Sequence, residues 1–333
     1  MRRHRWRGWA AAALGFAVAV PSWASNELPQ GIDIAPRSDE ETLAYHLLDA
    51  RLEYPRAQRV AQATGSPSTA AGAPGTKSGT PEPSANELNK QLANPVTSIW
   101  SLQFQFNNYR LENGEWSNNL LFQPVLPIGL TKDLNLITRP VIPLYNIVPH
   151  ETSSGEFEHT VGFGDITLLE LLSPADAGHW ILGAGPTFIF PTASSDFTGQ
   201  GKWQAGPALV VGYLTDKFIV GAFPQQWWSF AGDSSRPDTS QLNLQPIAAW
   251  FLPEGWSVGY SGNILADWKA SSGNKWTVPI GVAIGKVVKL GRLPIKISLA
   301  GQYMVIHPDG GQEWNIQLQL TPVIPKLIQE PLF

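Results

Sequence analysis

From residue 98 to the C-terminus, the chain divides into short segments in which apolar and polar residues alternate. Residues 98–109 read Ser-Ile-Trp-Ser-Leu-Gln-Phe-Gln-Phe-Asn-Asn-Tyr, and residues 314–321 read Trp-Asn-Ile-Gln-Leu-Gln-Leu-Thr. Successive side chains of a β-strand point to opposite faces, so each segment forms one apolar face and one amide-rich face. Unpartnered amides are costly in the dry core of a soluble sandwich but not in a hydrated lumen.

Eleven tryptophans of this region lie near the ends of segments. An indole has an apolar body and a polar N–H, and it favours the boundary between hydrocarbon and water. Segments of about ten alternating residues that end in aromatics are typical of a transmembrane β-barrel. We therefore predict that the membrane-interface aromatics are Trp100, Trp116, Trp180, Trp203, Trp227, Trp228, Trp250, Trp256, Trp268, Trp276 and Trp314.

The segments number twelve, an even number as expected for a single-chain bacterial barrel. The predicted fold is all-β, a closed antiparallel transmembrane β-barrel of about 12 strands over residues 98–333, preceded by a short helical or disordered N-terminal arm. The expected strands are 98–109, 117–128, 133–146, 158–172, 179–192, 201–214, 217–230, 241–252, 256–268, 275–288, 294–306 and 313–325.

The connections alternate in length, which indicates two different rims. Residues 131–133, 215–217 and 253–255 are tight turns, whereas 146–158 and 232–240 are longer and more polar. If both termini are periplasmic, Trp100, Trp180, Trp250 and Trp256 fall at the inner rim and the other seven tryptophans at the outer rim.

Prolines inside the predicted strands are the main contrary observation, because proline lacks a ladder N–H and a closed barrel has no edge strand. We expect some of them to mark bulges or strand ends. They are Pro124, Pro127, Pro140, Pro143, Pro186, Pro207, Pro246 and Pro279.

The alternation also predicts which side chains face the lumen. Amides outnumber charges in this set and no ring of like charge appears, which favours a neutral or mildly polar solute over an ion. The same groups could instead only hydrate a narrow barrel or pack against a plug. The predicted lumen-lining residues are Gln103, Gln105, Asn107, Arg139, Asp165, Lys202, Gln204, Gln225, Asn243, Gln245, Asn263, Lys296, Gln317 and Gln319, with Asp267 and Gln302 in the same inward register.

The N-terminus predicts export. Four arginines at positions 2–7, an apolar run over 9–20 and small residues before position 25 match a signal peptide spanning 1–24. Its removal takes the formal charge from −4 to −8, and no basic patch remains that indicates nucleic acid. The chain has no cysteine, and no later apolar run reaches the length of a membrane helix.

The arm that follows divides into three parts. Residues 25–62 hold one amphipathic helix, introduced by a capping box at Ser38–Glu41. Residues 63–84 are a flexible Ala/Gly/Pro/Ser linker, and 85–97 form a short helix that Pro95 ends before the barrel.

No catalytic constellation is found, so we predict that the chain is not an enzyme and has no cofactor or metal. An outer-membrane lipid hydrolase, the enzymatic rival, needs an activated serine beside a histidine. His150, His159 and His307 lie in or beside the longer loops, where a solvated histidine is the ordinary interpretation. His150 and His159 flank an acidic stretch, which is only a weak indication of cation binding.

Several stretches resemble a known bacterial family. Residues 92–98 (Leu-Ala-Asn-Pro-Val-Thr-Ser) leading into 104–109 (Phe-Gln-Phe-Asn-Asn-Tyr), residues 162–166 (Gly-Phe-Gly-Asp-Ile) and residues 320–327 (Leu-Thr-Pro-Val-Ile-Pro-Lys-Leu) are similar to the phenol meta-pathway degradation proteins. That family is often filed as transporters and at times mislabelled neuromedin U. The resemblance covers 86–333 and implies an outer-membrane barrel with no catalytic residues.

These patterns favour a passive channel or uptake protein for small molecules, hydrophobic or aromatic ones among them, in the outer membrane of a Gram-negative bacterium with the arm in the periplasm. The expected partners are outer-membrane lipid and a small hydrophobic or neutral solute. The alternative is a structural or adhesive barrel that acts through its external loops.

Overall fold

The computed structural model describes residues 12–15, 17–19, 83–328 and 330–333. The predicted helix of 25–62 and nearly all of the linker lie outside the described residues. Within the expected signal peptide, β1 (Ala12–Gly15) and β2 (Ala17–Ala19) pair as a small antiparallel sheet.

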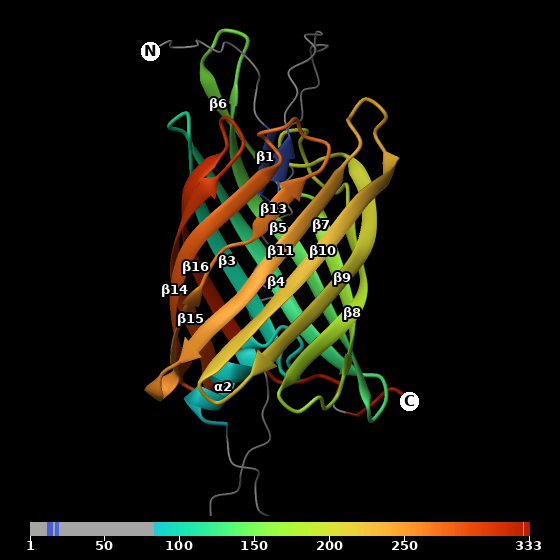
Figure 1. Ribbon diagram of the computed structural model, residues 1–333, viewed down its shortest axis with the longest axis vertical. Helices are drawn as coiled ribbons and strands as arrows, with labels where there is room; N and C mark the ends of the chain where they lie inside the picture. Colours follow the sequence, from blue (N-terminus) through green and yellow to red (C-terminus); the bar gives the residue numbers. More distant parts are fainter. Residues whose placement is uncertain (1–11, 16, 20–82, 329) are drawn as a thin grey trace, which may run out of the picture. The chain divides into compact units, whose positions relative to one another are not determined.

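The barrel is closed and antiparallel, as the sequence predicted. Its wall has twelve strand positions, here called staves, and two of the staves each consist of two short strands. Neighbours in sequence pair along the wall, β3 pairs β16, and β10 pairs β11, so the ladder returns to its start (Figure 1). The strands are β3 (Trp100–Leu111), β4 (Trp116–Gly129), β5 (Leu134–Glu151), β6 (Phe157–Gly162), β7 (Ile166–Pro174), β8 (Trp180–Phe190), β9 (Lys202–Leu214), β10 (Phe218–Gly232), β11 (Ser240–Phe251), β12 (Trp256–Tyr260), β13 (Ile264–Asp267), β14 (Trp276–Leu290), β15 (Leu293–Ile306) and β16 (Gln312–Ile324).

Two staves are interrupted. β6 and β7 form one stave with a break at 163–165, and β12 and β13 form another with a break at 261–263. At the second break, residues 245–248 of β11 have no ladder partner on β12 or β13. Apart from this stretch and β6, which pairs only β5, closure pairs the strands on both sides, and this removes most of the aggregation hazard of unpaired strands.

The alternation of apolar and polar residues in the sequence gives the barrel wall an inner and an outer face. Along β9, Lys202, Gln204 and Val210 are buried, whereas Leu209 and Val211 between and beyond them are exposed. The exposed apolar residues cover the outside of the barrel over most strands. A large apolar outer surface is stable when hydrocarbon, not water, surrounds it.

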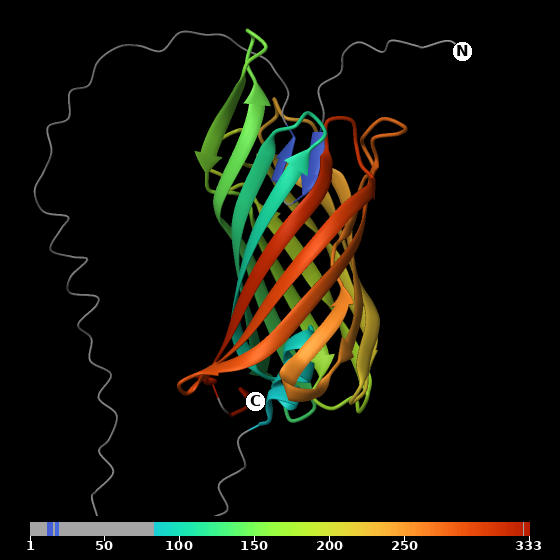
Figure 2. The ribbon, with the colours of Figure 1, turned by 90° about the vertical axis from the view of Figure 1, so that its left-hand side faces the viewer.

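A short helix stands at one end of the barrel. α2 (Ala85–Ala93) begins after Ser84, whose hydroxyl accepts a hydrogen bond from the Glu87 amide at 3.2 Å. It ends before Pro95, because the residue that precedes a proline disfavours helical backbone and Asn94 is extended. The helix lies at the end that also carries the turns at 215–217 and 253–255, here called the α2 end (Figures 1 and 2).

Neither α2 nor any other helix in the described ranges is long and apolar enough to span a membrane.

The opposite end carries most of the longer loops, at 191–201, 233–239 and 268–275. One loop at this end is shorter than the sequence predicted. Residues 146–158 were expected to form a loop, but β5 continues to Glu151 and pairs β6 from Phe157 onward, so only 152–156 turn. The resulting hairpin extends beyond its neighbours (Figure 1).

The prolines are accommodated in different ways. Pro143 and Pro279 lie at register shifts of the β4–β5 and β14–β15 ladders. Pro246 lies in the stretch of β11 that lacks partners on β12 and β13, and Pro186 faces Pro207 across β8 and β9. The expectation that some prolines mark bulges therefore holds for two of the eight.

Candidate functional site: the barrel lumen

One wall of the lumen is a hydrogen-bonded array of amide side chains on β3, β4, β15 and β16. Gln105 donates to Asn107 at 3.2 Å, and Asn107 donates to Asn119 on β4 at 2.7 Å. Gln123 on β4 donates back to Gln105 at 3.2 Å. The ladder pairing of Gln105 with Gln319 and of Asn107 with Gln317 places amides of β16 beside them.

The array continues around the wall to β15. Asn315 donates to Asn107 at 3.2 Å and to Gln302 at 3.3 Å. Gln302 donates to Gln317 at 3.1 Å and to the Ser261 hydroxyl at 2.8 Å. The amides of this array thus satisfy one another, which is what polar groups inside a protein require.

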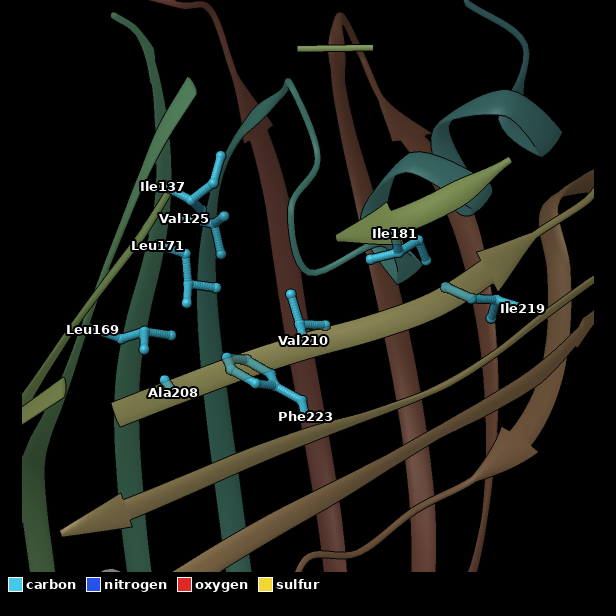
Figure 3. Packing of buried hydrophobic residues seen from close by; sticks show 9 residues of the cluster. All are labelled: Val125, Ile137, Leu169, Leu171, Ile181, Ala208, Val210, Ile219 and Phe223. Carbon is cyan, nitrogen blue, oxygen red and sulfur yellow. The ribbon is translucent and has the colours of Figure 1, made fainter. Parts of the chain in front are cut away.

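The other wall of the lumen is apolar. A cluster of buried side chains projects inward from β4, β5 and β7–β10 (Figure 3). Its members are Val125, Ile137, Leu169, Leu171, Ile181, Ala208, Val210, Ile219 and Phe223. Val96, from the connector between α2 and β3, packs against it.

α2 and the connector of 94–99 form the floor of the lumen. Asn89 is fully buried and donates to the carbonyl oxygens of Gly255 and Trp256 at 3.1 and 3.0 Å. The Asn86 side chain accepts from the Gly255 amide at 2.6 Å. Lys90 forms an ion pair with Asp216 at 2.9 Å and one with Glu87 at 2.7 Å. The helix is therefore fixed to the turns of the α2 end.

The far end of the lumen is narrowed by polar side chains. Gln241 donates to Gln200 at 3.0 Å and to Gln204 at 2.8 Å, and buried Lys202 pairs with Asp238 at 3.2 Å. The loop of 191–201 is held beside them, because Arg236 donates to the carbonyl oxygens of Asp196 and Gly199.

Between these two ends lies a cavity of about 330 Å³. Its lining combines the amide wall, four members of the apolar cluster, the connector, and two cationic side chains, Arg139 and Lys296. A volume of this size suits a small molecule, and the mixture of apolar surface with a few polar groups is usual for ligand pockets.

The structure places most of the predicted lumen residues on this cavity. Those that line it are Gln103, Gln105, Arg139, Gln225, Asn243, Gln245, Asn263, Lys296, Gln302, Gln317 and Gln319. Asn107 lies in the amide array behind it, and Lys202 and Gln204 lie at the narrowed far end.

Asp165 and Asp267 are placed differently. Asp165 sits at the break between β6 and β7, where its carboxylate accepts from the amides of Ala193 and Gln200 at 3.1 and 2.6 Å. It thus orders the loop of 191–201 and does not line the cavity. Asp267 accepts from the Lys269 amide at 2.9 Å in a turn.

The predicted interface tryptophans lie mostly on the outside, at strand ends. Exposed indoles there are Trp116, Trp180, Trp203, Trp228, Trp250, Trp256, Trp268 and Trp276. Trp314 packs edge-to-face against Trp116, with ring centroids 5.1 Å apart. Trp100 is buried at the start of β3 and donates to the Pro127 carbonyl at 2.8 Å.

Trp227 contradicts its predicted place at the interface. Its side chain is 2% exposed and lies inside the barrel, where the indole N–H donates to the Thr187 hydroxyl at 3.1 Å. Adjacent strand residues point to opposite faces, so Trp227 and Trp228 could not both face lipid. Gly206 on β9 lets the backbone of β10 approach closely beside Trp227, because a β-carbon there would collide with the Gln226 carbonyl group.

The histidines are engaged in local contacts. His159 lies 3.3 Å from a Glu115 carboxylate oxygen, and His150 stacks on Phe197 with ring centroids 3.9 Å apart. Within the described part of the chain, no group of His, Cys, Asp and Glu has the arrangement of a metal site.

Sequence reasoning missed the apolar wall and the floor. On β5, β7 and β10, the side chains that face inward are as apolar as those that face outward. The sequence pattern therefore does not distinguish the inner from the outer face of these strands. Asn119 and Gln123, by contrast, share the inward register of β4 and could have been found.

Comparison with known proteins shows the fold. No family model and no curated protein matches the chain. Among solved structures, an outer membrane channel from Pseudomonas putida F1 shares 18% identity with a TM-score of 0.52, covering 68% of this chain and 94% of that one. The porin NanC shares 9% identity with a TM-score of 0.39, covering 66% of this chain and 98% of that one. The barrel is thus of the kind that outer-membrane proteins have, and the phenol-pathway family remains an expectation.

Proposed function

We propose that this chain is an outer-membrane uptake channel through which small molecules, hydrophobic and aromatic ones among them, move passively. One observation carries the proposal: a cavity inside a closed barrel, with an amide wall on one side and an apolar wall on the other. A barrel that served only as a scaffold or an adhesin would need no such space.

The outer surface supports a place in the membrane. Strands of 12 to 18 residues, such as β3 and β5, exceed the 9–11 residues that a tilted strand needs to cross a bilayer. Exposed aliphatic residues cover the strand middles and exposed indoles their ends. In this proposal the α2 end faces the periplasm and the longer loops face outward.

The lining supports the class of solute. Val125, Leu169, Ile219 and Phe223 offer apolar surface to the cavity, while Gln105, Gln317 and Gln319 offer donors and acceptors opposite. A small molecule with an apolar body and one polar group can satisfy both walls at once.

Passage is tested by swelling of proteoliposomes that contain the mature chain. We expect arabinose to enter faster than into protein-free vesicles and raffinose, which is larger, to be excluded. A barrel that admits neither ions nor arabinose would refute the channel.

Recognition is tested by equilibrium binding of benzyl alcohol, a neutral aromatic probe, to the purified barrel. Leu169→Ala removes apolar lining, and at roughly 0.8 kcal/mol per CH₂ the affinity should fall by about tenfold or more. Leu168→Ala is the matched control, because Leu168 is the next residue of β7 and faces outward. Equal affinities in the two variants would contradict binding at the apolar wall.

A further inference from the structure

The charges on the cavity wall are of one sign. Arg139 and Lys296 line the cavity, and none of its other lining residues is charged. The chain as a whole has a formal charge of −4, with 27 acidic and 23 basic residues. The cavity lining is therefore positively charged although the chain as a whole is negatively charged.

Neither cation is neutralised by a carboxylate within the described ranges. Every ion pair found there involves other lysines, arginines or histidines. The Arg139 Nε is buried without a hydrogen-bond partner, and its guanidinium carbon lies 5.8 Å from the Phe223 ring centroid. An uncompensated charge beside apolar side chains is costly, and an anionic ligand would offset that cost.

Lys296 lies close to Ser298, Ser257 and Gly285 on the cavity wall. Gly285 on β14 has no side chain, and a β-carbon there would lie 3.1 Å from Lys296 Cε, 2.7 Å from Ser298 Oγ and 3.3 Å from Ser257 Oγ. All four residues line the cavity. The Ser257 hydroxyl donates to Asn89 at 3.3 Å, which leaves the Ser298 hydroxyl and the Lys296 ammonium as donors.

Lys296 and Arg139 lie toward the same end of the barrel. Lys296 is the fourth residue of β15 counted from the α2 end, and Arg139 is the sixth of β5. Apolar side chains of the cluster, Leu169 and Phe223 among them, line the same cavity. The cavity thus joins cationic donors with a surface that suits an apolar body.

We propose that the lumen binds small amphipathic monoanions, aromatic or short aliphatic carboxylates, with the carboxylate at Lys296 and Ser298 or at Arg139 and the apolar body against the cluster. This deepens the proposed function and rests on it, since it assigns a substrate class to the same lumen. Carboxylates form charge-assisted hydrogen bonds with such groups, which are about twice as strong as neutral ones.

The experiment compares three probes on the purified, detergent-solubilised chain by equilibrium dialysis. Benzoate carries both the ring and the anion, benzyl alcohol the ring alone and acetate the anion alone. We expect benzoate to bind at least about tenfold more tightly than either, because a hydrogen bond to a charged group contributes roughly 1.5–3 kcal/mol.

Variants then locate the anion. Lys296→Gln combined with Arg139→Gln should reduce benzoate affinity to that of benzyl alcohol and leave benzyl alcohol binding unchanged, whereas Lys296→Arg alone should retain the preference. Glutamine is polar and uncharged, like many of the residues that line the cavity, so the fold should tolerate it. Gly285→Ala places a methyl group against Ser298 Oγ and Lys296 Cε, so it should displace these donors and weaken benzoate binding alone.

Lys286→Gln is the matched control. Lys286 lies on β14 next to Gly285, but its ammonium lies outside the cavity, 4.6 Å from the Trp256 ring centroid. Removal of this cation should not alter benzoate affinity.

Two results would overturn the proposal: benzoate that binds no more tightly than benzyl alcohol, or a preference that the double Gln variant retains. The channel proposal fails separately, because arabinose entry into vesicles depends on neither probe.

Discussion

At the scale of single residues, the direction of a side chain decides what it does here. Trp227 and Trp228 are neighbours in sequence, yet Trp227 is 2% and Trp228 50% exposed. One indole packs inside the barrel and donates to Thr187, and the other faces the surroundings. A tryptophan near a strand end was correctly predicted to lie at the membrane interface only where its side chain also faces outward. The prediction therefore needs the alternation of side chains between the two faces of the strand as well as the position along it.

We therefore expect the two tryptophans to contribute very differently to stability. Trp227→Ala leaves a cavity and an unpaired Thr187 hydroxyl, and should lower the free energy of unfolding by about 3–5 kcal/mol. Reversible urea unfolding in lipid vesicles measures this loss.

Trp228→Ala serves as the comparison, since it removes only an exposed indole and should cost less than about half as much. Equal losses in the two variants would mean that Trp227 does not lie inside the barrel.

At the scale of elements, α2 closes one end of the barrel through few but specific contacts. Asn89 supplies two hydrogen bonds to the backbone at Gly255 and Trp256, and Lys90 bridges Glu87 and Asp216. The sequence predicted a short helix that Pro95 ends, and the structure adds the cap at Ser84. Its docking partners at 255–256 are far away in sequence, and no local pattern indicates them.

Asn89→Ala should release the helix. It leaves two carbonyl groups without their donor, at a cost of about 1–3 kcal/mol, so amides of α2 should exchange with deuterium roughly tenfold faster or more. Conductance of single channels should rise in parallel if the helix obstructs the lumen.

Gln91→Ala is the control on the same helix. Its side chain donates within α2 to Glu87 at 3.0 Å, so its removal also deletes a side-chain hydrogen bond but leaves the contacts with residues 255–256 in place. If exchange in Asn89→Ala equals that in Gln91→Ala, then Asn89 does not anchor the helix.

The ion pair between Lys90 and Asp216 makes the docking of α2 depend on pH, both in acid and in alkali. Hydrogen bonding and charge from Lys90 lower the pKa of the Asp216 carboxyl below its ordinary 3.8, and hydrogen bonds to Asp216 and Glu87 raise the pKa of Lys90 above its ordinary 10.5. The contact is therefore complete between these values, is lost as pH falls through the lowered Asp216 pKa, and is lost again above the raised Lys90 pKa.

Hydrogen exchange of α2 should accordingly show constant protection from about pH 5 to 9 and a fall in acid. In Asp216→Asn the part of the acid loss due to this pair should vanish. Asp216 is solvent-exposed, so the effect is small. An acid transition identical in both proteins would assign it to other groups.

At the scale of the whole molecule, the strand count and closure were predictable because both follow from alternation and turn spacing. The amide wall followed from the same rule, since Gln103, Gln105, Gln317 and Gln319 each face inward. The apolar wall and the two broken staves were not predictable, because they depend on which strands meet across the lumen and on where the ladder loses its partners. The account rests on one central claim, that the closed sheet separates a lipid-facing from a water-facing side.

The most direct test uses the absence of native cysteine. Single cysteines placed at Asn315, Ile316, Gln317 and Leu318 of β16 carry a nitroxide, and the barrel is reconstituted in bilayers. We expect the label at Ile316 and Leu318 to collide mainly with dissolved oxygen, which concentrates in lipid. At Asn315 and Gln317 it should collide less with oxygen than at either neighbour. Accessibility without this two-residue period along β16 would contradict the account.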